Sequence, residues 1–490
     1  MPLRILLPLS AAPRLARRLA LGAALSVAAT GCATNPATGR RELSLIPQGQ
    51  EIAMGQEGAK AAAAQMGIYP DSGLQRYVSG LGLSIAKSSE RPDLPWSFSV
   101  VDDPIVNAFA LPGGPVFVSR GILAHMNSEA QLVSVLGHEA GHVTAKHSVS
   151  QMSKQQILQI GLIGAMVLKP ELQQFGDVAS QGLGVLFLKF SRDDEIQADE
   201  LGFRYMTAKN YAPTEMAEMF KTLQRVSGGA GARGTPEWLS THPDPGNRVE
   251  KTAQRMAAAG RSFTGSTINR DVYLRRIDGM IFGEDPRAGY FQQTTFIQPT
   301  MQFRFDFPTG WRTQNSAEQV IGASAQGDAQ VALTLAGNVA PQAALQKFLQ
   351  QQGVRAGQVY TNPINGNTAA IGQFAAQTQD GKVLAGYVAY IQQDGITYQL
   401  LAITLQQSIQ QYDGVFRNVI GSFQRVTDPR LLTVTPQRVR IVQLPSAMSL
   451  TQFNQQYPSV IPIAQLALIN AMDPAQVIPA GTLVKRVVVQ

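Results

Sequence analysis

Five consecutive residues constrain this chain more than any other feature of it. They are His138–His142, with the sequence His-Glu-Ala-Gly-His, in an apolar segment whose pattern predicts a helix beginning after Ser128. On a helix, positions i and i+4 lie about 40° apart on one face, so the two imidazoles can bind one metal ion. Glu139 lies about 100° round from His138 and can reach a metal-bound water. The segment therefore predicts a helix that carries a metal site.

Two histidines need a further ligand, because a catalytic zinc site usually has three protein ligands and a water. His147 lies about 140° further round the helix, so we expect it to face away from the metal, either exposed or behind a ligating residue. Ser148 stands where a metzincin has its third histidine, which excludes that family. The remaining option is a carboxylate from a second helix, where Glu195 and Asp199 are spaced i and i+4. We expect Glu195 to bind the metal and Asp199 to accept the ring N–H of a ligating histidine.

These motifs together resemble the CAAX-prenyl-protease-type zinc metallopeptidases, which are gluzincins. The resemblance rests on His-Glu-x-x-His, on Glu-x-x-Ala-Asp about 50 residues later, and on the His-Pro pair at His242. It is closest to the soluble periplasmic lipoprotein branch, which shares the Asn-Pro-x-Thr-Gly-Arg-Arg-x-Leu-Ser stretch after Cys32, and it covers roughly residues 32–290. The resemblance implies one Zn²⁺ per chain, held by His138, His142 and Glu195, with Glu139 as the catalytic general base.

The resemblance also bears on three further parts of the chain. The segment Asn107-Ala108-Phe109-Ala110 aligns with the strand that edges the cleft in that family, and an extended peptide substrate can pair with such a strand. In periplasmic relatives the histidine of the His-Pro pair can approach the zinc. His242 is therefore a regulatory ligand, a substrate or transition-state contact, or a simple loop residue. Arg248 either pairs with a carboxylate or positions this loop.

The N-terminus predicts export and lipid attachment. Residues 1–31 contain a basic region, an apolar run and small residues before Cys32, as in a signal peptide. The Gly-Cys ending resembles a bacterial lipoprotein signal, with a short anchor helix as the alternative. In that reading Cys32 is acylated, and Ala33 after it is typical of lipoproteins sent to the outer membrane. No other apolar run reaches the about 18–20 residues that span a bilayer.

The organisation predicted along the chain is of α+β class. After a linker at 32–45 comes a mainly helical metallopeptidase domain at 46–265 with a small edge sheet, and then a connector at 266–297. Residues 298–427 open with Phe-x-Phe-Pro-x-Gly-Trp and resemble PsbP-like α+β domains. Residues 428–490 resemble a LysM βααβ domain. Pro445 follows its first strand where Gly-Asp is usual, so we expect peptidoglycan contact to be weak at most.

The predicted function is that of a zinc-dependent endopeptidase at the periplasmic face of the outer membrane, acting on unfolded or misassembled envelope proteins in quality control. Two alternatives stay open: a lipid-anchored chaperone or assembly factor with a latent zinc site, and a cell-wall-binding lipoprotein. The net charge is +7, but there is no dense Lys/Arg stripe with interleaved aromatics, so a nucleic-acid partner is not expected.

Overall fold

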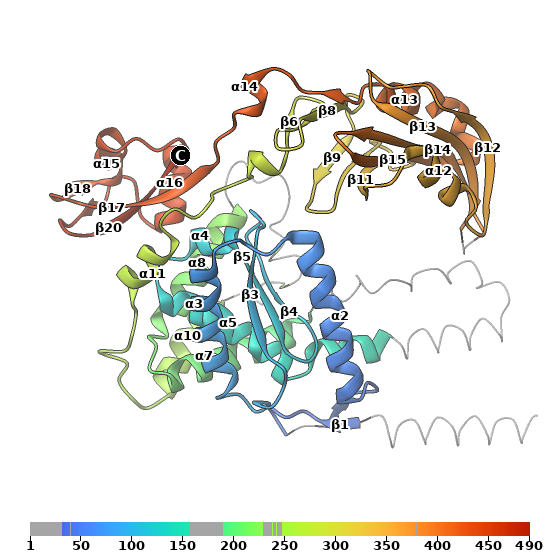
Figure 1. Cartoon of the computed structure of the whole chain (residues 1–490). Helices are drawn as coiled ribbons and strands as arrows, with labels where there is room; N and C mark the ends of the chain where they lie inside the picture. The colour runs from blue at the N-terminus through green and yellow to red at the C-terminus, as the bar shows by residue number, and fades with distance from the viewer. Residues whose placement is uncertain are drawn as a thin grey trace, which may run out of the picture.

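The computed structural model describes residues 32–39, 41–155, 190–228, 238, 242, 247–378 and 381–490. The predicted signal at 1–31 and the apolar run at 157–168 lie outside these residues. The chain is of mixed α+β class, with a helical region built around a small sheet, a second region dominated by one large sheet, and a small C-terminal unit (Figure 1). Within the described residues, no helix combines the length and apolarity needed to cross a membrane.

The helical region surrounds a three-stranded sheet in the order β3-β5-β4, in which β3 is parallel and β4 antiparallel to β5. Its elements are β1 (Cys32–Thr34), β2 (Arg41–Leu43), α2 (Gln48–Met66), α3 (Ser72–Ala86), β3 (Ser97–Val101), β4 (Ala108–Ala110), β5 (Pro115–Ser119), α4 (Arg120–His125), α5 (Glu129–Thr144), α7 (Arg192–Ala208), α8 (Thr214–Gly228), α10 (Arg248–Ala258) and α11 (Arg270–Ile277). Residues 147–155 are also helical. In Figure 1 this sheet stands between α2 and the remaining helices.

A tight turn sets the position of β4. Gly113 has φ 77° and Gly114 has φ 127°, a backbone region that glycine adopts readily. A Cβ on Gly113 would lie 2.7 Å from the Cα of Ile52 on α2, so a larger residue would push the turn away from that helix. The Pro-Gly-Gly sequence therefore brings β4 back along β5, with Phe109 paired to Phe117.

The predicted metal helix is confirmed as α5. All its residues from Glu129 to Thr144 are buried. It begins where the Ser128 side chain accepts a hydrogen bond from the Gln131 backbone N–H at 3.1 Å, which satisfies a backbone donor that the first helical turn leaves free. Because α5 is enclosed on all sides, any polar group along it must find its partner inside the protein.

The second region contains two antiparallel sheets. A four-stranded sheet has the order β16-β8-β7-β6, and a seven-stranded sheet has the order β12-β13-β14-β15-β11-β10-β9. The elements are η3 (Pro286–Ala288), β6 (Tyr290–Gln292), β7 (Thr295–Gln298), β8 (Phe303–Asp306), β9 (Arg312–Asn315), β10 (Gln319–Ala323), β11 (Ala329–Gly337), α12 (Pro341–Leu349), β12 (Val354–Tyr360), β13 (Thr368–Gln377), β14 (Val383–Gln393), β15 (Ile396–Leu405), η4 (Gln406–Ser408), α13 (Ile409–Gly421) and β16 (Gln424–Arg425).

Alternation along β14 separates the two faces of the large sheet. Tyr387 and Ala389 pack in one core with Phe416 of α13, whereas Val388 and Tyr390 pack in another with Leu345 of α12. Since successive side chains of a strand point to opposite faces, α12 and α13 cover opposite faces of the sheet.

The C-terminal unit follows the short helix α14 (Pro429–Leu432). It comprises β17 (Gln437–Gln443), β18 (Met448–Ser449), α15 (Leu450–Gln456), α16 (Ile463–Asn470), β19 (Val477–Ile478) and β20 (Leu483–Val489), with β17 paired to β20. Its apolar residues belong to the same core as those of the helical region. The unit predicted at 428–490 therefore shares its hydrophobic core with the helical region and not with the sheet region that precedes it in the chain.

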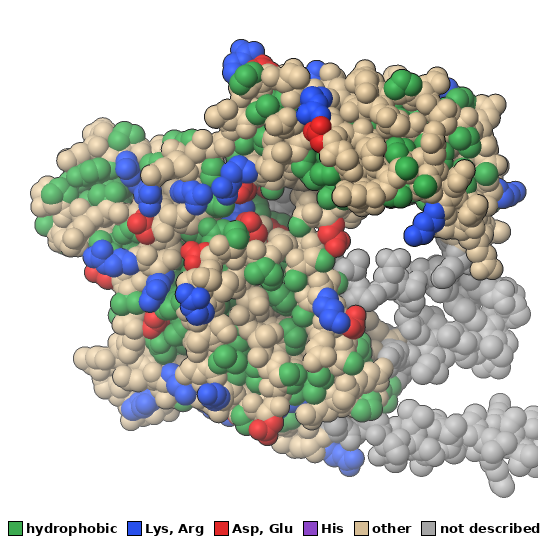
Figure 2. Space-filling view, in the orientation of Figure 1, with side chains coloured by type: hydrophobic (Ala, Val, Ile, Leu, Met, Phe, Trp, Pro, Cys, Tyr) green, Lys and Arg blue, Asp and Glu red, His purple; other side chains and the backbone are tan. Residues whose placement is uncertain are grey.

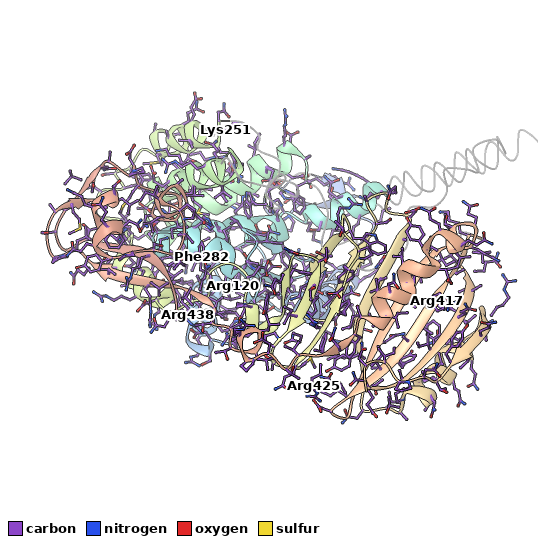
Figure 3. The ribbon with its side chains drawn as sticks, turned by 90° about the horizontal axis from the view of Figure 1, so that it is seen from above. Arg120, Lys251, Phe282, Arg417, Arg425 and Arg438 are labelled. Atoms are coloured by element: carbon purple, nitrogen blue, oxygen red, sulfur yellow. The ribbon has the colours of Figure 1, made fainter. Side chains whose placement is uncertain are left out.

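Several contacts hold the C-terminal unit against the helical region. The Phe282 backbone N–H donates to the Gln437 carbonyl at 2.8 Å, and Arg438 donates to the Gly279 carbonyl at 2.7 Å. Figure 3 shows Phe282, Arg438 and Arg120 near one another at this junction. The fully buried Lys485 ammonium group donates to the carbonyls of Ala124 and Met126, which stand just before the metal helix.

Candidate metal centre

All five histidines of the chain are buried, and none shows on the face in Figure 2. Such burial is unusual for groups that can ionise, because transferring a charge out of water is costly. Each buried imidazole therefore needs a hydrogen-bond partner or a metal. Four of the five, His138, His142, His147 and His242, lie in one group.

Three glycines let α5 and α7 cross at very short range. A Cβ on Gly202 of α7 would lie 2.9 Å from the backbone nitrogen of His138, and one on Gly141 of α5 would lie 3.1 Å from the Ala198 carbonyl oxygen. Gly137 faces Gly202 at the same crossing, where its Cβ would lie 3.2 Å from the Gly202 Cα. The absence of side chains at these positions brings the acidic residues of α7 against the histidines of α5.

Four side chains converge at this crossing. His138, His142, Glu195 and His242 each offer one ligand atom, and these atoms all lie within 4.8 Å of one another. The two Nε2 atoms of His138 and His142 are 3.1 Å apart, and His142 Nε2 lies 3.4 Å from Glu195 Oε1. His242 Nδ1 lies 3.0 Å from Glu195 Oε1 and 3.5 Å from His138 Nε2.

These spacings and donor types fit zinc. Zinc–nitrogen bonds of about 2.0–2.1 Å in a tetrahedral site put two nitrogen ligands about 3.3 Å apart. Imidazole and carboxylate are ligands that zinc takes in catalytic sites. Among the described residues, Glu195 Oε2 is buried with no hydrogen-bond partner, as is His242 Nε2. A metal ion would satisfy such buried polar atoms, so the group can hold a zinc ion.

Glu139 lies in the same enclosed space. Its side chain is fully buried, and neither carboxylate oxygen has a hydrogen-bond partner among the described residues. Glu139 Oε1 lies 3.7 Å from His242 Nε2. Burial raises the pKa of the Glu139 carboxyl, and the nearby imidazoles of His242 and His138 counter this only in part. A carboxylate in this setting is a stronger base than one in water.

Asp199 and Arg248 support His138 from behind. His138 Nδ1 lies 2.9 Å from Asp199 Oδ1, and Arg248 Nε donates to Asp199 Oδ2 at 2.9 Å. Burial by itself would raise the pKa of Asp199, but Arg248 and the hydrogen bond from His138 outweigh it and lower the pKa to about 2. The Arg248 guanidinium also lies over the Phe220 ring, 4.0 Å from its centroid. The sequence left two roles open for Arg248, pairing with a carboxylate and positioning the loop. In the structure Arg248 pairs with the carboxylate of Asp199.

His242 is held beside the cluster by Trp238. The two rings stack with centroids 4.3 Å apart and an interplanar angle of 22°. Burial lowers the pKa of His242, but the carboxylates of Glu195 and Glu139 outweigh this and raise it overall. Trp238 and Arg248 also line a cavity of about 280 Å³, together with Phe220, Leu223, Gln224, Ser227 and Gly228. Nothing in the local sequence pattern predicts that Trp238 belongs to the site.

His147 lies behind His142 and outside the ligand group, which is one of the two places that the sequence left open for it, and it is not exposed. Its Nδ1 lies 2.9 Å from His142 Nδ1, and its side chain is buried. The reason for this position is local, because α5 ends at Thr144 and Lys146 has a φ of 59°, so the helical angle no longer applies beyond that point. His125, in contrast, lies away from the cluster, with its Nδ1 2.8 Å from the Gly121 carbonyl oxygen.

The predicted substrate strand is β4, at one end of the three-stranded sheet. It pairs with β5 on one side, through Ala108 to Val118 and Ala110 to Val116. Asn107 precedes it and is buried, and its side-chain oxygen has no partner among the described residues. As a terminal strand of its sheet, β4 has one edge that does not pair within that sheet.

The buried cluster has the donor set of a zinc metalloprotease site. Residues 72–256 match the family described as Peptidase family M48. These residues include the crossing of α5 and α7 and all the residues of the cluster.

Named relatives agree with this class. The mitochondrial metalloendopeptidase OMA1 of Arabidopsis thaliana is 34% identical over 172 residues, covering 34% of this chain and 33% of the relative. The beta-barrel assembly-enhancing protease of Escherichia coli (strain K12) is 27% identical over 230 residues, covering 45% of this chain and 47% of the relative. The chain thus spans half or less of the length of these two curated relatives.

The solution structure of cyanobacterial PsbP from Synechocystis sp. PCC 6803 covers 29% of this chain and 98% of that chain, with 13% identity and a TM-score of 0.22. A likeness of this size carries no conclusion about residues 298–427. Their PsbP-like assignment, like the LysM-like assignment of 428–490, stays a prediction.

Proposed function

We propose that this chain is a zinc endopeptidase of the bacterial cell envelope that hydrolyses unfolded or misassembled envelope proteins. One observation carries the proposal: His138, His142, Glu195 and His242 converge in a buried group beside Glu139. In this proposal His138, His142 and Glu195 bind the zinc. The similarity to a relative named for β-barrel assembly supports an envelope substrate.

The mechanism assigns separate tasks to the residues around the cluster. Bound zinc lowers the pKa of water to about 7 and polarises a scissile carbonyl. Glu139 takes a proton from the attacking water and passes it to the leaving amine. Asp199, itself held by Arg248, accepts the His138 ring N–H, which leaves His138 Nε2 with its lone pair toward the cluster.

The substrate binds in an extended form along β4 in this proposal. Backbone groups of an incoming peptide pair with the strand that contains Ala108, Phe109 and Ala110, and Asn107 stands at its start. Pairing of this kind uses main-chain hydrogen bonds, which every sequence can make. It therefore suits substrates that are recognised because they are unfolded. The cavity beside Trp238 and Arg248 is of a size to take one apolar side chain of such a peptide.

The proposed location follows from the N-terminal segment. Removal of residues 1–31 and acylation of Cys32 would tether the chain to the periplasmic face of the outer membrane. Asn35, three residues after Cys32, is buried and donates to the Ala145 carbonyl at 3.1 Å. In the proposed lipoprotein the peptidase region would thus lie close to the lipid surface, since three residues span at most about 11 Å.

A second candidate function is a tethered chaperone or assembly factor whose metal site is closed. The observation that favours it is the position of His242, which stacks on Trp238 and lies 3.0 Å from Glu195 Oε1. A fourth protein ligand would occupy the position that a catalytic site keeps for water. In this candidate His242 acts as a regulatory ligand, and proteolysis requires its displacement.

One experiment tests both candidates. Cleavage of casein and of an unfolded outer-membrane protein is measured with the whole chain and its Glu139→Gln and His242→Ala variants. The endopeptidase proposal expects zinc-dependent cleavage that Glu139→Gln abolishes. Faster cleavage by His242→Ala identifies a closed site, whereas equal or slower cleavage removes that candidate. If none of the three cleaves either substrate with zinc bound, the endopeptidase proposal is wrong.

A further inference from the structure

We propose that His147 is a positioning residue that fixes the ring orientation and the tautomer of His142, with Gln197 as its own partner. The proposal rests on the proposed function in one respect, which is that His142 uses Nε2 to hold the metal. It adds a residue that the metal motif does not contain.

The contacts form a continuous line behind the metal cluster. His142 Nε2 faces the cluster, 3.1 Å from His138 Nε2. On the other side of the same ring, His142 Nδ1 lies 2.9 Å from His147 Nδ1. His147 Nε2 lies 2.7 Å from Gln197 Oε1, a side chain on the same helix as Glu195. Both imidazoles are buried, so water does not take the place of either contact.

The protons along this line have one consistent arrangement. Two ring nitrogens 2.9 Å apart share a single proton, so one donates and the other accepts. If His142 Nε2 presents its lone pair to the metal, His142 Nδ1 carries the proton and donates it to His147 Nδ1. His147 then carries its own proton on Nε2 and donates to Gln197 Oε1, which is an amide oxygen and can only accept.

A sharp turn after α5 is what returns His147 to His142. The helix ends at Thr144, and Lys146 adopts a φ of 59° before the chain becomes helical again at His147. Without this turn, a continuous helix would place His147 about 140° away from His142. The left-handed conformation at a lysine is unfavourable by itself, so surrounding contacts must hold it.

Two buried side chains hold that turn. Arg91 donates to the Val143 carbonyl at 3.0 Å and pairs with both carboxylate oxygens of Glu51, at 2.6 and 2.9 Å. Asn35 donates to the Ala145 carbonyl at 3.1 Å. These groups satisfy the last carbonyls of α5, which a helix end leaves free. The turn is therefore clamped from two sides, and His147 is placed with little freedom.

The two histidines of the motif thus differ in their outer partners. His138 is supported by a carboxylate, Asp199, whereas His142 is supported by the imidazole of His147. Outer partners of ligating histidines usually change metal affinity by about 10–100-fold when they are removed. We expect the same range for His147, since its loss leaves the His142 Nδ1–H without an acceptor inside the protein.

The test compares zinc affinity among three variants of the whole chain. His147→Leu removes the acceptor, and His147→Asn restores an acceptor near the position of Nδ1. His125→Leu is the matched control, because it removes a buried histidine of the same region that does not contact the cluster. Zinc dissociation constants are measured by competition with a chelator, and visible spectra are recorded after Co²⁺ substitution. Thermal unfolding of each metal-free variant reports whether it folds.

We expect His147→Leu to weaken zinc binding by about 10–100-fold and to change the Co²⁺ spectrum, while His147→Asn recovers most of the affinity. His125→Leu should bind zinc like the unaltered chain. Equal affinity in His147→Leu and the unaltered chain would overturn the proposal, as would equally weak binding by His147→Leu and His147→Asn. If the unaltered chain itself does not bind one zinc ion, the proposed function fails instead, so the two failures are distinguishable.

Discussion

The helical region and the large-sheet region differ in the polar side chains that they bury. All five histidines lie between residues 125 and 242, and the helical region also buries Glu139, Glu195 and Asp199. In the sheet region, the buried polar residues among those described are uncharged, namely Ser324, Gln393, Thr397 and Thr404. Its core contains instead a dense group of aromatic residues that includes Phe296, Phe303, Phe305 and Phe416.

The two regions are therefore stabilised in different ways. Buried charges are costly unless they are paired, so the helical region is stable only when its carboxylates, imidazoles and guanidinium groups meet correctly. The sheet region is stabilised mainly by removing apolar area from water, at about 25 cal/mol per Å². We therefore expect single polar substitutions in the helical region to change zinc binding or cleavage. Substitutions in the sheet region should leave both unchanged.

The largest effect is expected from Glu139→Gln. General acid–base catalysis contributes about 10²–10⁴-fold to rate, so cleavage of an unfolded substrate should fall by about that factor. Zinc content should not change, because Glu139 belongs to the enclosed space but not to the proposed ligand set. Cleavage assays combined with metal analysis measure both quantities. Unchanged cleavage would show that another residue takes the proton.

One core substitution in each region tests whether zinc binding depends on the helical region alone. Phe305→Ala in the sheet core should lower the free energy of unfolding of that region by about 3–5 kcal/mol. Leu136→Ala on α5 should lower stability by about 2–5 kcal/mol and should also weaken zinc binding, because Leu136 lies on the metal helix. Denaturant unfolding and zinc titration are run on both variants. The contrast fails if Phe305→Ala weakens zinc binding as much as Leu136→Ala does.

Asp199→Asn should weaken zinc binding by about 10–100-fold. The substitution removes the negative charge that Arg248 pairs with and leaves His138 a neutral amide oxygen in place of a carboxylate acceptor, while side-chain size is preserved. Ser324→Ala, at a buried polar position of the sheet region, is the control and should leave zinc affinity unchanged. Competition with a chelator measures both variants. Equal zinc affinity in the two variants would remove the proposed support of His138.

The smallest effect is expected at Lys485, where the C-terminal unit meets the helical region. Burial, together with the nearby Arg270, lowers the pKa of Lys485 well below its usual value. Between the folded pKa and the unfolded value of about 10.4, the unfolded chain binds more protons than the folded chain. Stability of the unaltered chain should therefore rise with pH relative to Lys485→Met, by up to about 1.4 kcal/mol per pH unit.

Denaturant unfolding of both chains at pH 8 and pH 9 measures this difference. Arg270 and His125 interact electrostatically with Lys485, and burial lowers the pKa of His125 to about 4, so His125 does not titrate in this range. A difference in stability that is the same at both pH values would mean that folded Lys485 keeps an ordinary pKa.

The sequence by itself determined the local part of the site. Helical periodicity is enough to place His138 and His142 on one face, and α5 lies where that pattern predicts it. The same reasoning places Glu195 and Asp199 on one face of a second helix, which is α7. Both inferences succeed because positions three and four apart on a helix are set by backbone geometry alone. The mixed α+β class could likewise be predicted from the change in pattern near residue 300.

Only the tertiary structure decided how these local pieces meet. The close crossing of α5 and α7 depends on the contact between Gly137 and Gly202, which are 65 positions apart in the chain, so no local sequence pattern predicts it. The placement of His147 depends on a turn at Lys146 that distant side chains hold, and the shared core of the C-terminal unit depends on contacts such as that between Lys485 and Ala124. Such contacts follow from packing of the whole chain, because burial and hydrogen-bond satisfaction are met between segments and not within them.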